Sequence, residues 1–136
     1  MNVIIDTDAL LGLFNIKDFH HKKAVEVIKK CVEKGINIFI LATTLSEFAL
    51  LSSYRIGLKQ TKKAVSDIAS SDYLSCDITL EITKEAVNLY EKQTSKEESL
   101  FDCYVMTTAK KLLCDGIFSF DEGYKKNGFK LLEEII

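Results

Sequence analysis

The chain has 136 residues, the usual size of one folded domain, and a formal net charge of −2 at pH 7. Its composition, with 47% hydrophobic and 28% charged residues, is that of a globular protein, and no uncharged apolar segment is long enough to cross a membrane. The four cysteines form no C-x-x-C pair, which argues against a zinc site or a disulfide framework and favours a reducing compartment. We therefore expect a single cytoplasmic domain over residues 1–136.

The first third of the chain predicts two strands separated by helices. Residues 2–5 (NVII) form a short apolar segment typical of a buried strand, and residues 9–14 are compatible with a helix. Apolar side chains recur at helical spacing over residues 18–34, and Gly35 ends that helix. Residues 36–41 (INIFIL) are rich in β-branched and aromatic side chains, which predicts the second strand.

The middle of the chain continues the alternation. Helical spacing over residues 43–54 and 58–70 predicts two helices, which Gly57 separates. A third short strand is expected over residues 73–78, followed by a helix over residues 79–93.

The last third predicts a helix over residues 99–113, a fourth strand over residues 116–120 (GIFSF) and a fifth, at an edge, over residues 130–135. Strands that alternate with helices form parallel sheets with helices on both faces. We therefore predict an α/β protein, a three-layer α/β/α sandwich with a mostly parallel central sheet.

Four carboxylates are placed where such a sheet binds ligands. Asp6 directly follows the first strand and Asp121 follows the fourth, while Glu47 and Asp102 lie among apolar neighbours near the starts of two helices. Strand ends and the starts of the helices that follow them lie at the same edge of a parallel sheet, where ligands bind. All four side chains are therefore expected to converge at that edge.

Each acid also has a local explanation. Thr44-x-x-Glu47 matches a capping box, and Ser99-x-x-Asp102 is a looser version of the same pattern. Asp121 could belong to a turn, and Asp6 could accept hydrogen bonds from the amides that follow it. Four acids aimed at one edge favour a site for a hard cation, because carboxylates brought together repel each other and Mg²⁺ or Mn²⁺ relieves that repulsion.

Four segments in this order resemble those of the PIN domain family: IIDT, SEFALL, FDCYVMTTA and SFDEGY. Within the family, the chain looks like the compact VapC-type ribonucleases, the toxins of type II toxin–antitoxin pairs; a solitary RNA-processing PIN protein is the other option. The resemblance implies that one quartet of acids is both metal-binding and catalytic: Asp6, Glu47, Asp102 and Asp121. It implies that these acids hold one or two Mg²⁺ or Mn²⁺ ions and that a metal-activated water cleaves the RNA. It also implies a homodimer and a cognate antitoxin. Around the quartet, Thr7 and Ser119 are expected as hydroxyl partners and Asp8 as an additional carboxylate.

Two other functional classes remain open. Asp6-x-Asp8 after an apolar strand also resembles haloacid-dehalogenase-type phosphatases, with Asp6 as nucleophile, Asp8 as general acid/base and Lys110 or Lys111 as the lysine. A helix over residues 18–34, in place of the flap of that family, argues against this alternative. The third option is a PIN module that holds RNA or protein without cutting. A receiver domain is set aside because the expected lysine is missing from GIFSF.

Basic and histidine residues suggest secondary surfaces. The side chains that we expect on one side of a helical segment, where they could hold an RNA backbone, are Arg55, Lys59, Lys62 and Lys63. His20 and His21, at the start of the first long helix, have no third ligand nearby and are interpreted as surface or capping residues rather than zinc ligands.

Overall fold

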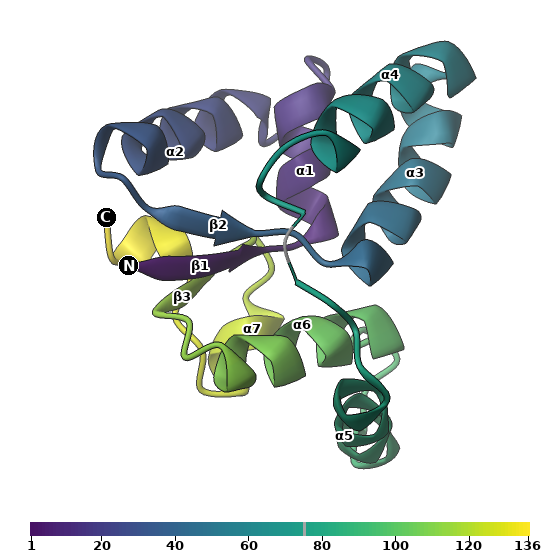
Figure 1. Ribbon diagram of the computed structural model, residues 1–136, viewed down its shortest axis with the longest axis vertical. Helices are drawn as coiled ribbons and strands as arrows, with labels where there is room; N and C mark the ends of the chain where they lie inside the picture. The colour runs from purple at the N-terminus through teal and green to yellow at the C-terminus, as the bar shows by residue number, and fades with distance from the viewer. Residues whose placement is uncertain (75) are drawn as a thin grey trace.

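The computed structural model describes residues 1–74 and 76–136, which are organised around a parallel sheet (Figure 1). Its strands are β1 (Asn2–Ile5), β2 (Asn37–Phe39) and β3 (Gly116–Phe118), in the order β2-β1-β3. Both neighbours pair in parallel with β1, so that Ile4 lies opposite Phe39 on one side and Ile117 on the other. The carboxyl end of the central strand therefore leads directly to Asp6.

Helices cover both faces of this sheet (Figure 1). On one face lie α1 (Thr7–Phe14), α2 (His21–Glu33), α3 (Ala42–Ile56) and α4 (Leu58–Ala69). On the other lie α5 (Leu80–Glu91), α6 (Leu100–Lys111) and the short α7 (Gly123–Lys126). A 3₁₀ turn, η1 (Leu132–Glu134), ends the chain. The three-layer α/β/α fold with a parallel sheet predicted from the sequence is confirmed.

Strand β1 supplies both hydrophobic cores because successive side chains of a strand point to opposite faces. Val3 and Ile5 pack with α1, α2 and α3 in one core, and Ile4 packs with α6 in the other. All three side chains are almost completely buried. A strand buried on both faces explains why Val3, Ile4 and Ile5 are continuously apolar rather than alternating with polar residues.

Three segments differ from the predicted elements or cannot be fully compared with them. The expected strand over residues 130–135 is wrong, because Leu131 makes a single parallel bridge with Ile117 before the chain turns into η1. The expected strand over residues 73–78 includes Ser75, which lies outside the described residues; of its described members, Cys76 forms an isolated bridge with Leu41. Helix α1 begins at Thr7, two residues earlier than expected.

Two composition-based expectations can also be compared with the structure. All four cysteines carry free thiols, and Cys31 and Cys103 are buried as small apolar side chains. In the described part of the chain, no helix is both long and apolar enough to cross a membrane.

Candidate active site

Asp6 occupies the junction of β1 and α1. Its backbone is extended and its amide donates to the Phe118 carbonyl at 3.0 Å, which continues the sheet pairing by one residue. The residue is only 6% exposed. Carboxylate oxygen Oδ2 accepts a hydrogen bond from the Tyr124 hydroxyl at 2.8 Å, whereas Oδ1 is buried without a partner among the described residues. The side chain makes no capping hydrogen bond to α1. The Thr7 amide nevertheless lies close enough to lower the pKa of the Asp6 carboxyl, in line with the explanation by the amides that follow it.

Asp102 stands in the first turn of α6 and serves two purposes. Its Oδ2 accepts from the Ser99 backbone amide at 2.7 Å, and its own amide donates to the Ser99 hydroxyl at 3.3 Å. These bonds form a complete capping box, so the local explanation for Asp102 is correct. The second oxygen, Oδ1, remains free to face the Tyr124 hydroxyl at 3.3 Å.

Tyr124 connects the two acids, although it was not predicted from the sequence. Its hydroxyl lies within hydrogen-bonding distance of Asp6 and Asp102, and the side chain is 2% exposed. Burial and these two negative charges raise the pKa of the phenol, so the group stays protonated and donates. Nothing in the sequence indicates that the Tyr124 hydroxyl contacts residues 22 and 118 positions away.

Asp8, Ser119 and Asp121 form a connected chain of hydrogen bonds. Asp8 Oδ2 accepts from the Ser119 hydroxyl at 3.0 Å and from the Phe120 amide at 2.7 Å. The same Ser119 hydroxyl accepts from the Asp121 amide at 3.0 Å. Asp8 therefore holds the segment after β3 against the start of α1. Asp121 is exposed, and its Oδ1 accepts from the Gly123 amide at 2.8 Å, as expected of a turn residue.

Glu47 lies on the second turn of α3, half-buried, with Thr7 nearby. The helix begins at Ala42 without a side-chain cap, so the predicted capping box of Thr44 and Glu47 is wrong. This leaves the Glu47 carboxylate available to the site. The Thr7 hydroxyl is buried and makes no hydrogen bond to a described residue, although it lies close enough to Glu47 to oppose part of the rise in the pKa of that carboxyl.

The charges of these acids act on one another. Burial, followed by the charges of Asp8 and Asp102, raises the pKa of Asp6 from 3.8 to about 8, and the Tyr124 hydrogen bond opposes that rise. Burial likewise raises the pKa of Asp8 and of Asp102, and Asp121 adds to both. The pKa of Glu47 is raised by burial and by Asp102 and Asp8. The charges of Asp8, Asp102 and Asp121 therefore make the ionisation of neighbouring acids more costly.

The donor set fits a divalent hard cation in its chemistry. It offers carboxylate oxygens, the ligands that Mg²⁺ and Mn²⁺ prefer, and one of them, Asp6 Oδ1, is buried with no other partner among the described residues. A cavity of about 10 Å³, about the size of one water molecule, opens between Asp102, Asp121 and Tyr124. Within residues 1–74 and 76–136, however, no three acidic, histidine or cysteine side chains lie close enough together to hold an ion as they stand.

The predicted basic stripe does not lie on one helix. Gly57 adopts a φ of 89°, a conformation that favours glycine, and it divides the segment into α3 and α4. Arg55 therefore stands in the last turn of α3, while Lys59, Lys62 and Lys63 belong to α4. Figure 1 shows that α4 begins at the end of α3 that is remote from the sheet. Lys63 also forms an ion pair with Asp67 at 3.0 Å.

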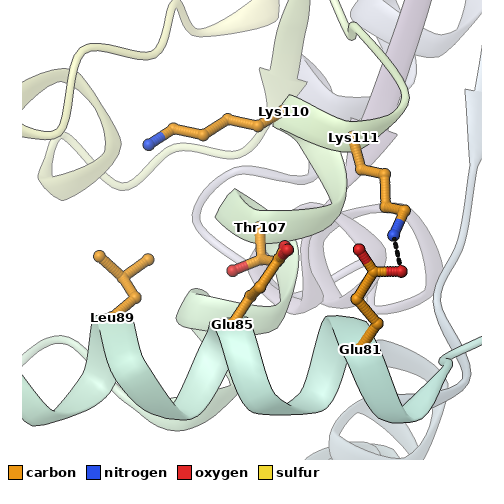
Figure 2. Close-up of a pocket in the computed structure, with 6 residues that line it drawn as sticks. All are labelled: Glu81, Glu85, Leu89, Thr107, Lys110 and Lys111. Atoms are coloured by element: carbon orange, nitrogen blue, oxygen red, sulfur yellow. Dashed lines mark ion pairs between the residues drawn. The ribbon is translucent and has the colours of Figure 1, made fainter.

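A larger hollow, of about 440 Å³, lies between α5 and α6 (Figure 2). Lys111 points across it to Glu81 and forms an ion pair of 2.8 Å. Lys110 and Lys111 stand in the last turn of α6, about 12–14 Å along the helix from Asp102 at 1.5 Å per residue. Neither lysine is placed beside Asp6, and both Asp8 oxygens already accept hydrogen bonds. The phosphatase alternative is therefore not supported.

Comparison with known proteins identifies the fold. The family model of the PIN domain matches residues 3–130. Among solved structures, the chain is similar to that of VapC20 from Mycobacterium tuberculosis, described as a toxin that cleaves the sarcin–ricin loop. The TM-score is 0.82 and the identity 19%, and the match covers 94% of this chain and 96% of the other. No curated protein sequence matches this chain.

Proposed function

The chain belongs to the PIN domain family, and we propose that it is a divalent-metal-dependent endoribonuclease that hydrolyses RNA phosphodiester bonds. Asp6 provides the main support for the proposal. This carboxylate is almost completely buried, surrounded by other acids, and has one oxygen without a partner among the described residues. Such an arrangement is unfavourable without a cation, because a buried charge needs a compensating partner.

Asp6, Glu47, Asp102 and Asp121 are the residues that would hold the metal. When bound, Mg²⁺ or Mn²⁺ supplies Lewis-acid stabilisation of the phosphate and activates water for attack. The protein positions the carboxylates. Tyr124 donates to Asp6 Oδ2, while Oδ1 has no partner among the described residues.

Hydrogen bonds fix the positions of the neighbouring acids. Through Ser119, Asp8 fixes the backbone that carries Asp121, and the capping box fixes Asp102. Thr7 stands beside Glu47 with its hydroxyl free of other described partners. In this scheme Asp8 supports the site without holding the ion itself.

We further propose that the protein is the toxin of a type II toxin–antitoxin pair, acting in the cytoplasm as a homodimer until a cognate antitoxin inhibits it. The similarity to the VapC20 structure over nearly the full length of both chains supports this assignment. A solitary RNA-processing PIN protein is the second candidate, since the same fold and the same acids would serve it. A PIN module that binds RNA or protein without cutting would not require the uncompensated Asp6.

The decisive experiment compares wild-type protein with Asp102→Asn in cleavage of a structured RNA containing loops. Reactions are run with Mn²⁺, with Mg²⁺ and with EDTA. We expect cleavage by the wild type with either ion, none in EDTA, and a loss of at least about a hundredfold in Asp102→Asn, a typical cost of removing an electrostatic group from an active site. Asn at this position still accepts the Ser99 amide bond, so the helix start is preserved.

Equal cleavage by the two proteins would reject the mechanism, because it would place the activity elsewhere or in a contaminant. Thr79→Ala, at the start of α5, is the matched control: it removes a helix cap on another helix and should leave cleavage unchanged. Co-purification with a small protein encoded next to this chain, and inhibition by it, would distinguish a toxin from a solitary nuclease.

A further inference from the structure

We propose that the turn between α1 and α2 (residues 15–20) is a binding platform for single-stranded RNA, with the exposed ring of Phe19 stacking on an unpaired nucleobase. The inference rests on the proposed function, since it names how the substrate of that site is held. Phe19 is 94% exposed, which is unusual for a large aromatic side chain in a soluble domain. Three observations point to a nucleic-acid base as its partner.

First, Phe19 is the outer end of a column of aromatic rings. Phe118, buried in the core, contacts Phe120 with ring centroids 6.0 Å apart. The His20 ring stacks on Phe120 with centroids 4.3 Å apart and an angle of only 5° between the planes. Phe19 then meets His20 edge-on at 5.0 Å. The column supports the Phe19 ring from below, which leaves its outer surface available to a planar partner.

Second, hydrogen bonds hold the turn in place. The Asn15 side chain accepts from the Lys17 amide at 3.1 Å, and the Asp18 side chain accepts from the His20 amide at 2.8 Å. His21 Nδ1 contacts the Gly12 carbonyl at 2.7 Å, which ties the start of α2 to α1. Phe19 is therefore presented outward by an ordered turn, and little conformational entropy is lost when a base stacks on it.

Third, basic side chains border the same turn. A hollow of about 490 Å³ is lined by Lys17 and Arg55, together with Phe14, Asn15, Ile16, Ile56 and Gln60. Neither Lys17 nor Arg55 forms an ion pair with a described carboxylate, so both charges are free for phosphate. Aromatic stacking beside cationic side chains is how proteins bind single-stranded nucleic acid, whereas double-stranded RNA keeps its bases stacked inside.

The platform is continuous with the acidic site. The Phe120 amide donates to Asp8 Oδ2 at 2.7 Å, and Asp121 is the next residue. The ring on which His20 stacks thus belongs to the residue that Asp8 fixes at the edge of the acids. A strand that passes from Phe19 over His20 to Phe120 would reach Asp121, the next residue, so the platform would position an unpaired segment of RNA next to the acids.

The experiment measures RNA binding separately from cleavage. Asp102→Asn protein is titrated, in Mg²⁺, into a twelve-nucleotide single-stranded RNA that carries 2-aminopurine, whose fluorescence falls on stacking, and into the matching duplex. Phe19→Ala is added to this background and should weaken single-strand binding about tenfold and abolish the quenching, since stacking of one base contributes about 1–3 kcal/mol. Phe19→Trp should restore both signals. Because the Phe19 ring is almost fully exposed, neither change should disturb folding.

The control is Tyr90→Ala, which removes a partly exposed aromatic ring from α5, on the opposite side of the molecule from the α1–α2 turn (Figure 1). It should leave binding unchanged. Binding within twofold of the parent after Phe19→Ala, or no measurable binding of single strands, overturns the proposal. A change of oligomeric state in Phe19→Ala with unaltered RNA binding also overturns it and assigns the ring to a protein contact. None of these results depends on cleavage, which tests the proposed function separately.

Discussion

Replacing Asp6 by asparagine should make the metal-free protein more stable at pH 8 while removing its activity. The pKa of Asp6 is raised from 3.8 in an exposed aspartate to about 8 in the folded chain, so the folded protein binds the proton more tightly than the unfolded chain. The unfolded chain therefore loses this proton first as the pH rises. Stability is fully present at pH values below about 4. It declines between about 4 and 8, because the unfolded chain ionises there while the buried carboxyl stays protonated, and it levels off above about 8.

The size of the effect follows from that interval. The difference between 3.8 and about 8 is about four pH units, which at 1.36 kcal/mol per unit gives an upper limit of about 5–6 kcal/mol. Relaxation around the charge and penetration of water reduce the penalty, so we expect Asp6→Asn to add about 2–4 kcal/mol to the unfolding free energy at pH 8. At about 4 °C per kcal/mol for a domain of this size, the melting temperature should rise by about 8–16 °C.

Urea unfolding in EDTA, followed by circular dichroism at pH 5, 6, 7 and 8, measures this difference. The gain should be smallest at pH 5 and grow with pH, and Asp72→Asn, an exposed aspartate, should show no such trend. Added Mn²⁺ should then stabilise the wild type but not Asp6→Asn, because the neutral amide lacks the negative charge that attracts the ion. Parallel pH profiles of the two proteins, or a less stable Asp6→Asn at pH 8, would refute the reasoning.

Three further substitutions test the surroundings of Asp6. Tyr124→Phe removes the hydroxyl that donates to Asp6 and so raises the pKa of that carboxyl further. The affinity for Mn²⁺, measured by calorimetry, and the rate of RNA cleavage should both fall about tenfold. An unchanged affinity would contradict this. Asp8→Ala leaves the Phe120 amide without its acceptor, so the unfolding free energy measured in urea should fall by about 2 kcal/mol. Cleavage should be reduced but not abolished, in contrast to Asp6→Asn. Thr79→Ala removes the cap of α5, because the Thr79 hydroxyl accepts from the Ile82 amide at 3.1 Å. We expect a loss of about 1 kcal/mol in urea unfolding and full activity. Loss of cleavage would show that α5 affects the site.

The sequence was a good guide wherever one segment carried its own signal. Apolar runs such as NVII and the helical spacing of residues 18–34 depend on neighbours within a few positions, so the alternating order of elements and the α/β/α fold followed from them. Boundaries were less well predicted, because an edge segment such as residues 130–135 becomes a strand only if pairing partners extend along it. Here the 3₁₀ turn begins one residue after the single bridge at Leu131.

In the candidate site, too, local features were predictable from the sequence and long-range contacts were not. Because β1 is a buried strand of a parallel sheet, the position of Asp6 at its carboxyl end was enough to place that acid at the ligand edge. The sequence could not show that Asp8 holds the segment after β3, a contact across 112 positions, or that Tyr124 joins Asp6 across 118. Contacts of this range depend on how the elements pack. Local pattern thus indicated which acids to consider. Tertiary structure alone decided which groups contact them and left Asp6 Oδ1 without a partner among the described residues.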